Sequence, residues 1–186
     1  MKKLKLFGLS SVMLLLLAAC GTTEGSIDNT KRFDLWEYMK TPIDYRVTYD
    51  IYENGQKIKF YEEDHRLLNY DTYERVSNDG VTTLSLNGGE IVMEEPSSVV
   101  KINHFVYLGD ENIFRGEFIN NCTFDQYYKN YEVKGEIFHE VLMVSCTSVS
   151  GVQEEYYYGY NEGIVYKYTN DRGSITERVK VHENRI

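Results

Sequence analysis

Proline is scarce in this chain of 186 residues, and long apolar runs are missing from most of it. The only prolines are Pro42 and Pro96, and no apolar run after residue 19 is longer than the four residues Val141–Val144. A membrane-spanning helix needs about 20 apolar residues, which excludes one beyond residue 19. The 17 tyrosines and 8 phenylalanines favour strands over helices or disorder.

Positive charge is also in short supply. Twenty lysines and arginines face 29 aspartates and glutamates, so the formal net charge is −9. An acidic chain repels nucleic acids and anionic lipid headgroups. The composition therefore excludes nucleic-acid binding, and adsorption to a bilayer through charge.

Motifs of the common enzyme classes are missing as well. The chain contains no G-x-S-x-G, no H-E-x-x-H and no glycine-rich phosphate loop. Its histidines are scattered, each in or beside a predicted strand: His65, His104, His139 and His182. Acidic runs such as Glu62–Asp64 alternate between the two faces of a strand, so we interpret them as solvated strand ends. The sequence thus offers no candidate catalytic, cofactor-binding or metal-ligating residue.

The N-terminus has the pattern of an export signal. Three lysines within the first five residues precede an apolar stretch, residues 6–19, which ends in Leu17-Ala18-Ala19-Cys20. A basic head, a short apolar middle and small residues at the end are typical of a secretory signal peptide. The last four residues resemble the lipobox of bacterial lipoproteins. An ordinary signal peptide with an incidental cysteine and an uncleaved signal anchor are the alternatives.

The lipobox resemblance implies that residues 1–19 are removed and that Cys20 carries a diacylglyceryl group. Gly21, where aspartate would indicate retention at the inner membrane, is compatible with transfer to the outer one. We therefore expect a cell-envelope protein held by the lipid on Cys20, with the periplasmic face of the outer membrane favoured. Cleavage removes three lysines and takes the formal net charge from −9 to −12.

The remaining chain divides into a tether and one domain. Residues 20–32 are small and polar, which predicts a lipidated flexible tether. Residues 33–186 show turn signals about every ten residues, which predicts a single antiparallel all-β domain. We expect a curved sheet, an open barrel or a sandwich of about 9–11 strands. One short helix is expected to begin at Asp34-Leu35-Trp36-Glu37, where a capping residue precedes an acid, and to end near Lys40.

The hairpin around Asn54-Gly55 carries the clearest local signal, because this dipeptide favours a type I′ turn between alternating strands. A two-residue turn predicts Ile51 opposite Ile58, Tyr49 opposite Phe60 and Asp50 opposite Lys59.

Two cysteines remain once Cys20 is assigned to the lipid. Cys122 and Cys146 form an even pair in an exported chain, so a disulfide is the expected state. Two buried free thiols are the alternative. A metal site is less favoured, because no histidine lies at ligand spacing from either cysteine.

The segment Tyr156–Lys167 resembles a strand–turn–strand ending found in small uncharacterised envelope lipoproteins. That resemblance implies a terminal hairpin and no activity. Three functional classes follow: a non-catalytic binding or structural module, a periplasmic carrier or sensor of an apolar ligand, and, least favoured, an enzyme. Partners other than the membrane stay open among an envelope protein, a glycan and an apolar ligand. A filled interior favours the module, and a pocket of several hundred Å³ favours the carrier.

Metabolic labelling with a palmitate analogue tests the anchor. The label is expected on the wild-type protein and on Cys122→Ser, because the acylated thiol is that of Cys20. It is expected to disappear in Cys20→Ser, and label that persists without Cys20 would contradict the lipobox assignment.

Overall fold

The computed structural model describes residues 30–41 and 44–186, which are almost entirely β-structure. The predicted signal peptide, Cys20 and residues 21–29 of the predicted tether lie outside the described residues. Twelve strands form one antiparallel sheet in the order β10-β11-β12-β13-β14-β2-β3-β4-β5-β6-β7-β9, and β1 pairs with β8 in a second sheet. The all-β prediction is confirmed, with more strands than the 9–11 expected.

The elements in chain order are β1 (Phe33–Asp34), α1 (Leu35–Met39), β2 (Tyr45–Glu53), β3 (Gln56–Asn69), β4 (Thr72–Ser77), β5 (Gly80–Asn87), β6 (Glu90–Glu95), β7 (Ser98–Asn103), β8 (Phe105–Val106), β9 (Phe114–Gly116), β10 (Ile119–Val133), β11 (Glu136–Ser148), β12 (Gln153–Gly159), β13 (Gly163–Asp171) and β14 (Ser174–Arg185).

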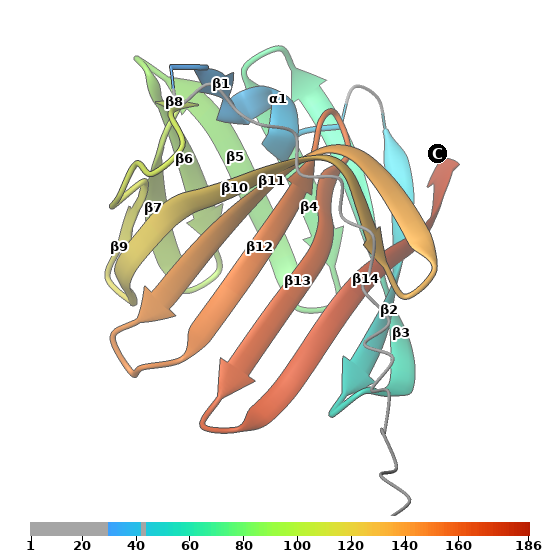
Figure 1. The fold of residues 1–186 in the computed structure, drawn as a ribbon. Helices are drawn as coiled ribbons and strands as arrows, with labels where there is room; N and C mark the ends of the chain where they lie inside the picture. The colour runs from blue at the N-terminus through green and yellow to red at the C-terminus, as the bar shows by residue number, and fades with distance from the viewer. Residues whose placement is uncertain (1–29, 42–43) are drawn as a thin grey trace, which may run out of the picture.

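The large sheet curls into a nearly closed barrel (Figure 1). The segment between β8 and β9 joins its two edges. Ile113 N donates to Cys122 O on β10 (3.2 Å), while Asn103 N on β7 donates to Ile113 O (2.9 Å). Gly109 N also donates to Phe124 O (2.8 Å). Closure satisfies edge groups that would otherwise be free to pair with another chain.

Helix α1 covers one end of the barrel (Figure 1). The Asp34 side chain caps the helix by accepting from Trp36 N (3.0 Å), as the sequence predicts. Leu35 and Trp36 are fully buried in a core that includes Phe124 and interior residues of most strands. The helix thus fills the half of the barrel beneath it. No helix among the described residues is long and apolar enough to span a membrane.

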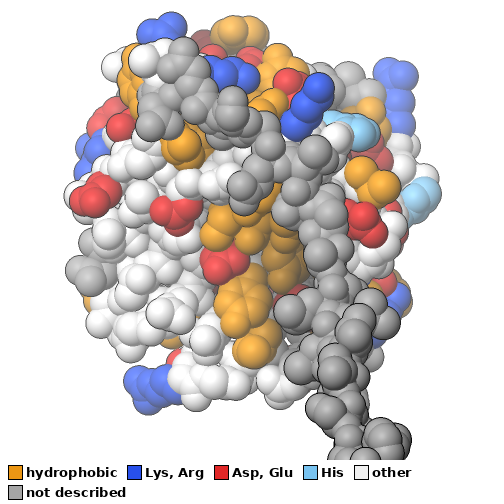
Figure 2. All heavy atoms as spheres, in the orientation of Figure 1, with side chains coloured by type: hydrophobic (Ala, Val, Ile, Leu, Met, Phe, Trp, Pro, Cys, Tyr) orange, Lys and Arg blue, Asp and Glu red, His pale blue; other side chains and the backbone are white. Residues whose placement is uncertain are grey.

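A second layer lies on the outside of the barrel, where the β10–β11 hairpin bends over β12, β13 and β14 (Figure 1). Glu140 adopts a left-handed conformation (φ 49°) within β11 near this bend. Tyr131 stacks on Tyr157 with ring centroids 4.5 Å apart, and Lys134 Nζ lies 3.0 Å from Glu177 Oε2. Figure 2 shows hydrophobic side chains, tyrosine included, gathered on this face over β12 and β13. Much of the tyrosine surplus therefore serves packing.

The register predicted for the β2–β3 hairpin is wrong beyond its first two pairs. The Asn54-Gly55 turn forms, but a bulge between Ile51 and Tyr52 inserts one extra residue on β3. Ile51 therefore faces Lys59 instead of Ile58, Asp50 faces Phe60, and Tyr49 faces Tyr61. Because side chains alternate, the bulge reverses the faces of the rest of β3.

The predicted disulfide is present. Cys122 on β10 and Cys146 on β11 are direct cross-strand partners whose Cα atoms lie 4.1 Å apart, and both side chains are buried in the barrel interior. The bond fixes the register of the hairpin that carries both the closing edge and the outer layer.

The double variant Cys122→Ala/Cys146→Ala is expected to lose about 3 kcal/mol of unfolding free energy, because the 24-residue separation leaves a loop of that size unconstrained in the unfolded chain. Denaturant unfolding in oxidising buffer measures the loss. Equal stability of the variant and the wild type would contradict a structural role for the bond.

Candidate functional site

The barrel interior is hollow at the end away from α1. A cavity of about 410 Å³ adjoins a second of about 270 Å³, and the two share Glu63, Arg75, Thr82, Glu95 and Ser97 as lining residues. The turns that join β6 to β7, β9 to β10 and β11 to β12 lie around the mouth. Helix α1 contacts the β12–β13 turn at the opposite end, since Asn161 N donates to Glu37 O (2.7 Å).

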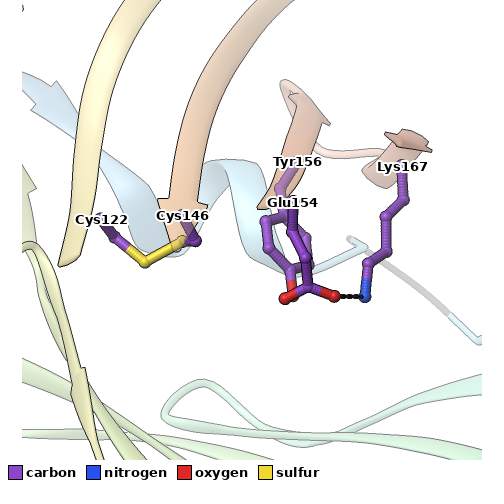
Figure 3. The surroundings of a disulfide bond; sticks show 5 residues. All are labelled: Cys122, Cys146, Glu154, Tyr156 and Lys167. Atoms are coloured by element: carbon purple, nitrogen blue, oxygen red, sulfur yellow. Dashed lines mark hydrogen bonds and ion pairs between the residues drawn. A yellow bond between two sulfur atoms is a disulfide. The ribbon is translucent and has the colours of Figure 1, made fainter. Parts of the chain in front are cut away.

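One wall of the larger cavity is apolar and aromatic. It is built from inward-facing side chains of β6, β7, β9, β10, β12 and β13: Met93, Val100, Phe114, Ile119, Tyr156, Tyr158 and Ile164. Alternation along the strands produces this wall, because every second residue faces the interior. The disulfide belongs to the same wall, as Cys146 lines the cavity near Tyr156 (Figure 3).

A charged wall built from β3, β4 and β14 faces the same space. Arg178 Nη2 lies 2.8 Å from Glu63 Oε2, and the guanidinium carbon lies 3.7 Å from the ring centroid of Tyr49. Glu63 in turn contacts His65 Nε2 at 3.1 Å, and His65 Nδ1 is hydrogen-bonded to the Tyr73 hydroxyl. This chain, from Arg178 through Glu63 and His65 to Tyr73, runs from the cavity into the core and is called the interior relay below.

Burial and pairing together set the protonation of the interior relay. Burial alone raises the pKa of Glu63, but the hydrogen bond from His65 and the charge of Arg178 outweigh it and hold that pKa well below its usual range. Burial lowers the pKa of His65 and raises that of Tyr73. The consistent arrangement is an ionised Glu63 that accepts from Nε2–H of a neutral His65, whose Nδ1 accepts from the Tyr73 hydroxyl; this tautomer is assigned from the network.

A second ion pair lies beside the disulfide (Figure 3). Lys167 Nζ is 2.7 Å from Glu154 Oε1, and the Tyr156 hydroxyl donates to Glu154 Oε2 (2.8 Å). Burial raises the pKa of Tyr156 well above its ordinary value, so its hydroxyl remains a donor. The cavity therefore holds fixed charges of both signs next to an apolar surface.

The interior relay was not predicted from the sequence. Glu63 was interpreted as part of a solvated strand end, and this is wrong, because only 7% of Glu63 and 1% of His65 are exposed. The i, i+2 spacing of Tyr61, Glu63 and His65 was the available signal, since such residues share one face of a strand. The bulge that turns this face inward carries no mark in the sequence.

The other histidines near the predicted strands do not converge with carboxylates at the cavity. His104 Nε2 contacts Asp34 Oδ1 (2.9 Å), and His139 Nδ1 contacts Asn130 Oδ1 (2.6 Å) on the exposed hairpin. Among residues 30–41 and 44–186, no group of three His, Cys, Asp or Glu side chains has a metal-binding arrangement. Of the site residues named from the sequence, Cys122 and Cys146 meet, and Cys20 lies outside the described part of the chain.

A comparison with models of known protein families gives no match, and a comparison with curated proteins gives none either.

His65→Gln tests the interior relay through pH. The folded state keeps His65 neutral, while the unfolded chain binds a proton there below pH 6.5, so acid favours unfolding. Wild-type unfolding free energy is expected to fall between pH 6.5 and 5, with His65 contributing up to about 1.4 kcal/mol per pH unit. His65→Gln removes this contribution and flattens the slope.

The control is His139→Gln, whose histidine is exposed. It is expected to keep the wild-type slope. The titration of Glu63 does not affect this comparison. Because the pKa of Glu63 is lowered in the folded protein, its protonation reduces the unfolding free energy only at pH values below its ordinary pKa of 4.5. A wild-type slope in His65→Gln would contradict a neutral buried His65.

Proposed function

We propose that this protein is a lipid-anchored binding protein of the cell envelope, and that its barrel admits a small ligand at the end away from α1. The observation that carries the proposal is the hollow of about 410 Å³, with the adjoining one of about 270 Å³, in a barrel whose other end is filled. Ligand pockets are commonly about 300–1,000 Å³, mostly apolar, with a few fixed polar groups. The cavity has this size, but polar and charged side chains make up about as much of its lining as apolar ones do.

The filled half of the barrel supports the proposal too. Leu35, Trp36 and the core around them make one end rigid, and the interior relay fixes the charged wall by hydrogen bonds. A preformed cavity loses little entropy when a ligand binds, which favours affinity. Binding is thus favoured over a purely structural role.

A carrier of a wholly apolar ligand is less favoured by the charged wall. Such a ligand would displace water from Arg75, Glu63 and Glu154 without replacing its hydrogen bonds, which is costly. The apolar wall nevertheless suits part of a ligand. A molecule with one apolar and one polar portion matches both walls.

The predicted export signal supports the location in the cell envelope. Leu17-Ala18-Ala19-Cys20 supports lipidation, and a protein held by two acyl chains stays at the membrane surface without help from its acidic body. The disulfide between Cys122 and Cys146 agrees with an oxidising compartment.

Native mass spectrometry of the full lipidated protein, extracted gently from its own membrane, tests the proposal. We expect a bound small molecule that is released on denaturation. Thr82 lines both cavities, so Thr82→Trp fills the space and is expected to abolish the extra mass.

Thr83→Trp is the matched control, because the neighbouring residue on β5 points to the other face of the sheet. It is expected to retain the molecule. A wild type without any bound molecule, or a Thr82→Trp variant with wild-type occupancy, would overturn the cavity as the binding site.

A further inference from the structure

We infer that Arg75 is the anion anchor of the cavity, so that the ligand is an amphiphile with an anionic head and an apolar or aromatic body. The inference rests on the proposed function and specifies the chemical class of the ligand. Arg75 lies on β4 and lines both the larger and the smaller cavity. Its cross-strand neighbour on β5 is Thr82, so its side chain occupies the wall between the interior relay and β6.

Among the described residues, Arg75 differs from the other cations of the cavity in having no carboxylate within salt-bridge distance, although its charge helps to lower the pKa of Glu63 on the neighbouring strand. Arg178 is paired with Glu63 (2.8 Å) and Lys167 with Glu154 (2.7 Å). Among the described residues, the only hydrogen-bond acceptor of the Arg75 side chain is Met93 Sδ, 3.3 Å from Nη2. A thioether is a weak acceptor. The buried Nε of Arg75 has no hydrogen-bond partner in the described part of the chain; Arg178 Nε has none either, but the guanidinium of Arg178 has the carboxylate of Glu63 beside it.

An unpaired guanidinium inside a protein is expensive. Removing a charged group from water is unfavourable unless a counter-charge and hydrogen bonds replace the water, and buried donors without partners are rare. In the ligand-free protein, the Arg75 guanidinium therefore lacks a salt bridge and a strong hydrogen-bond acceptor. A carboxylate, phosphate or sulfate group matches the guanidinium fork with two parallel hydrogen bonds.

The acidic side chains nearest the mouth do not supply the missing counter-charge of Arg75. Glu95, two strands from Arg75 in the sheet, accepts from Ser98 Oγ (2.8 Å) and is exposed, as is Glu117 at the β9–β10 turn. Neither forms an ion pair with Arg75. Their solvated charges at the entrance disfavour a ligand with several negative groups, so a single anionic head is favoured.

The apolar wall then receives the body of the ligand. Met93 contacts the Arg75 guanidinium and lines the same cavity as Val100, Phe114 and Tyr156. An aromatic or aliphatic group joined to the anion contacts this wall while the head remains at Arg75. The two halves of the ligand are thus bound by neighbouring surfaces of one cavity.

Isothermal titration calorimetry of the full chain in non-ionic detergent, with a detergent blank, tests the inference. The probes are 2-naphthoate, 2-naphthyl phosphate and the neutral isostere 2-naphthamide. We expect the wild type to bind at least one anionic probe at least tenfold more tightly than the amide. The stronger of the two anions identifies the head group that the site prefers.

Arg75→Met is expected to weaken anion binding at least tenfold without lowering the denaturation midpoint of the ligand-free protein, because it breaks no salt bridge and only a weak hydrogen bond to Met93 Sδ. A structural arginine would show the reverse. Arg115→Met, which removes an exposed arginine paired with Glu90 on β6, is the control and is expected to bind the probes within twofold of the wild type.

The remaining outcomes separate this inference from the proposed function. Equal binding of anions and amide, lost in Thr82→Trp but kept in Arg75→Met, overturns Arg75 as the anchor and leaves the binding cavity in place. No probe binding in a protein that still carries its own small molecule also overturns the anchor alone. No probe binding together with no bound molecule overturns both.

Discussion

The barrel depends on the hydrogen bonds of Ile113, the residue before edge strand β9, which connect β7 to the opposite edge strand β10. This residue donates to Cys122 O on β10 and accepts from Asn103 N on β7, so the twelve-stranded sheet becomes a nearly continuous wall. Without this seam, Phe114 and Ile119 would not face a common interior, and the apolar wall of the cavity would not exist. The disulfide next to the seam holds β10 on β11 at the same level.

Closure creates an interior with two chemically different halves, one apolar and one charged. Beneath α1 the space is filled by aromatic and aliphatic side chains, and hydrophobic burial supplies the stability of that half. Farther along the barrel, the interior relay places an ionised carboxylate, a neutral histidine and a guanidinium out of bulk water. Such groups are costly to bury, and they are tolerated because each has a partner. Arg75 is the exception in one respect, since no carboxylate among the described residues lies within salt-bridge distance of it and its hydrogen-bond acceptor is the thioether of Met93.

Local patterns in the sequence were enough to predict the fold class, the capped helix at Leu35–Met39 and the pairing of Cys122 with Cys146. The first two depend on residues that are close in sequence or on alternation along a strand, and the disulfide followed from the even pair of cysteines in a chain expected to be exported. The bulge between Ile51 and Tyr52 was not predictable, because a bulge adds one residue without a distinctive composition. That one residue leaves Phe60 65% exposed, and it carries Glu63 and His65 into the interior.

The cavity was beyond sequence analysis for a different reason. Its lining comes from strands between residues 63 and 178, brought together only when the sheet closes. From the sequence, a filled interior and a pocket were two alternative predictions for the β-domain. The barrel contains both, one at each end, and this division could be seen only in three dimensions.

The position of the first strand has a consequence for access. Strand β1 begins at Phe33, beside the end of the barrel that α1 covers. A tether from a lipid on Cys20 would therefore join the barrel at this end. Thirteen residues at about 3.5 Å each give the leash a reach of at most about 45 Å. A tether of that length would let the barrel stand clear of the surface to which the lipid is anchored, with its hollow end free of the point of attachment.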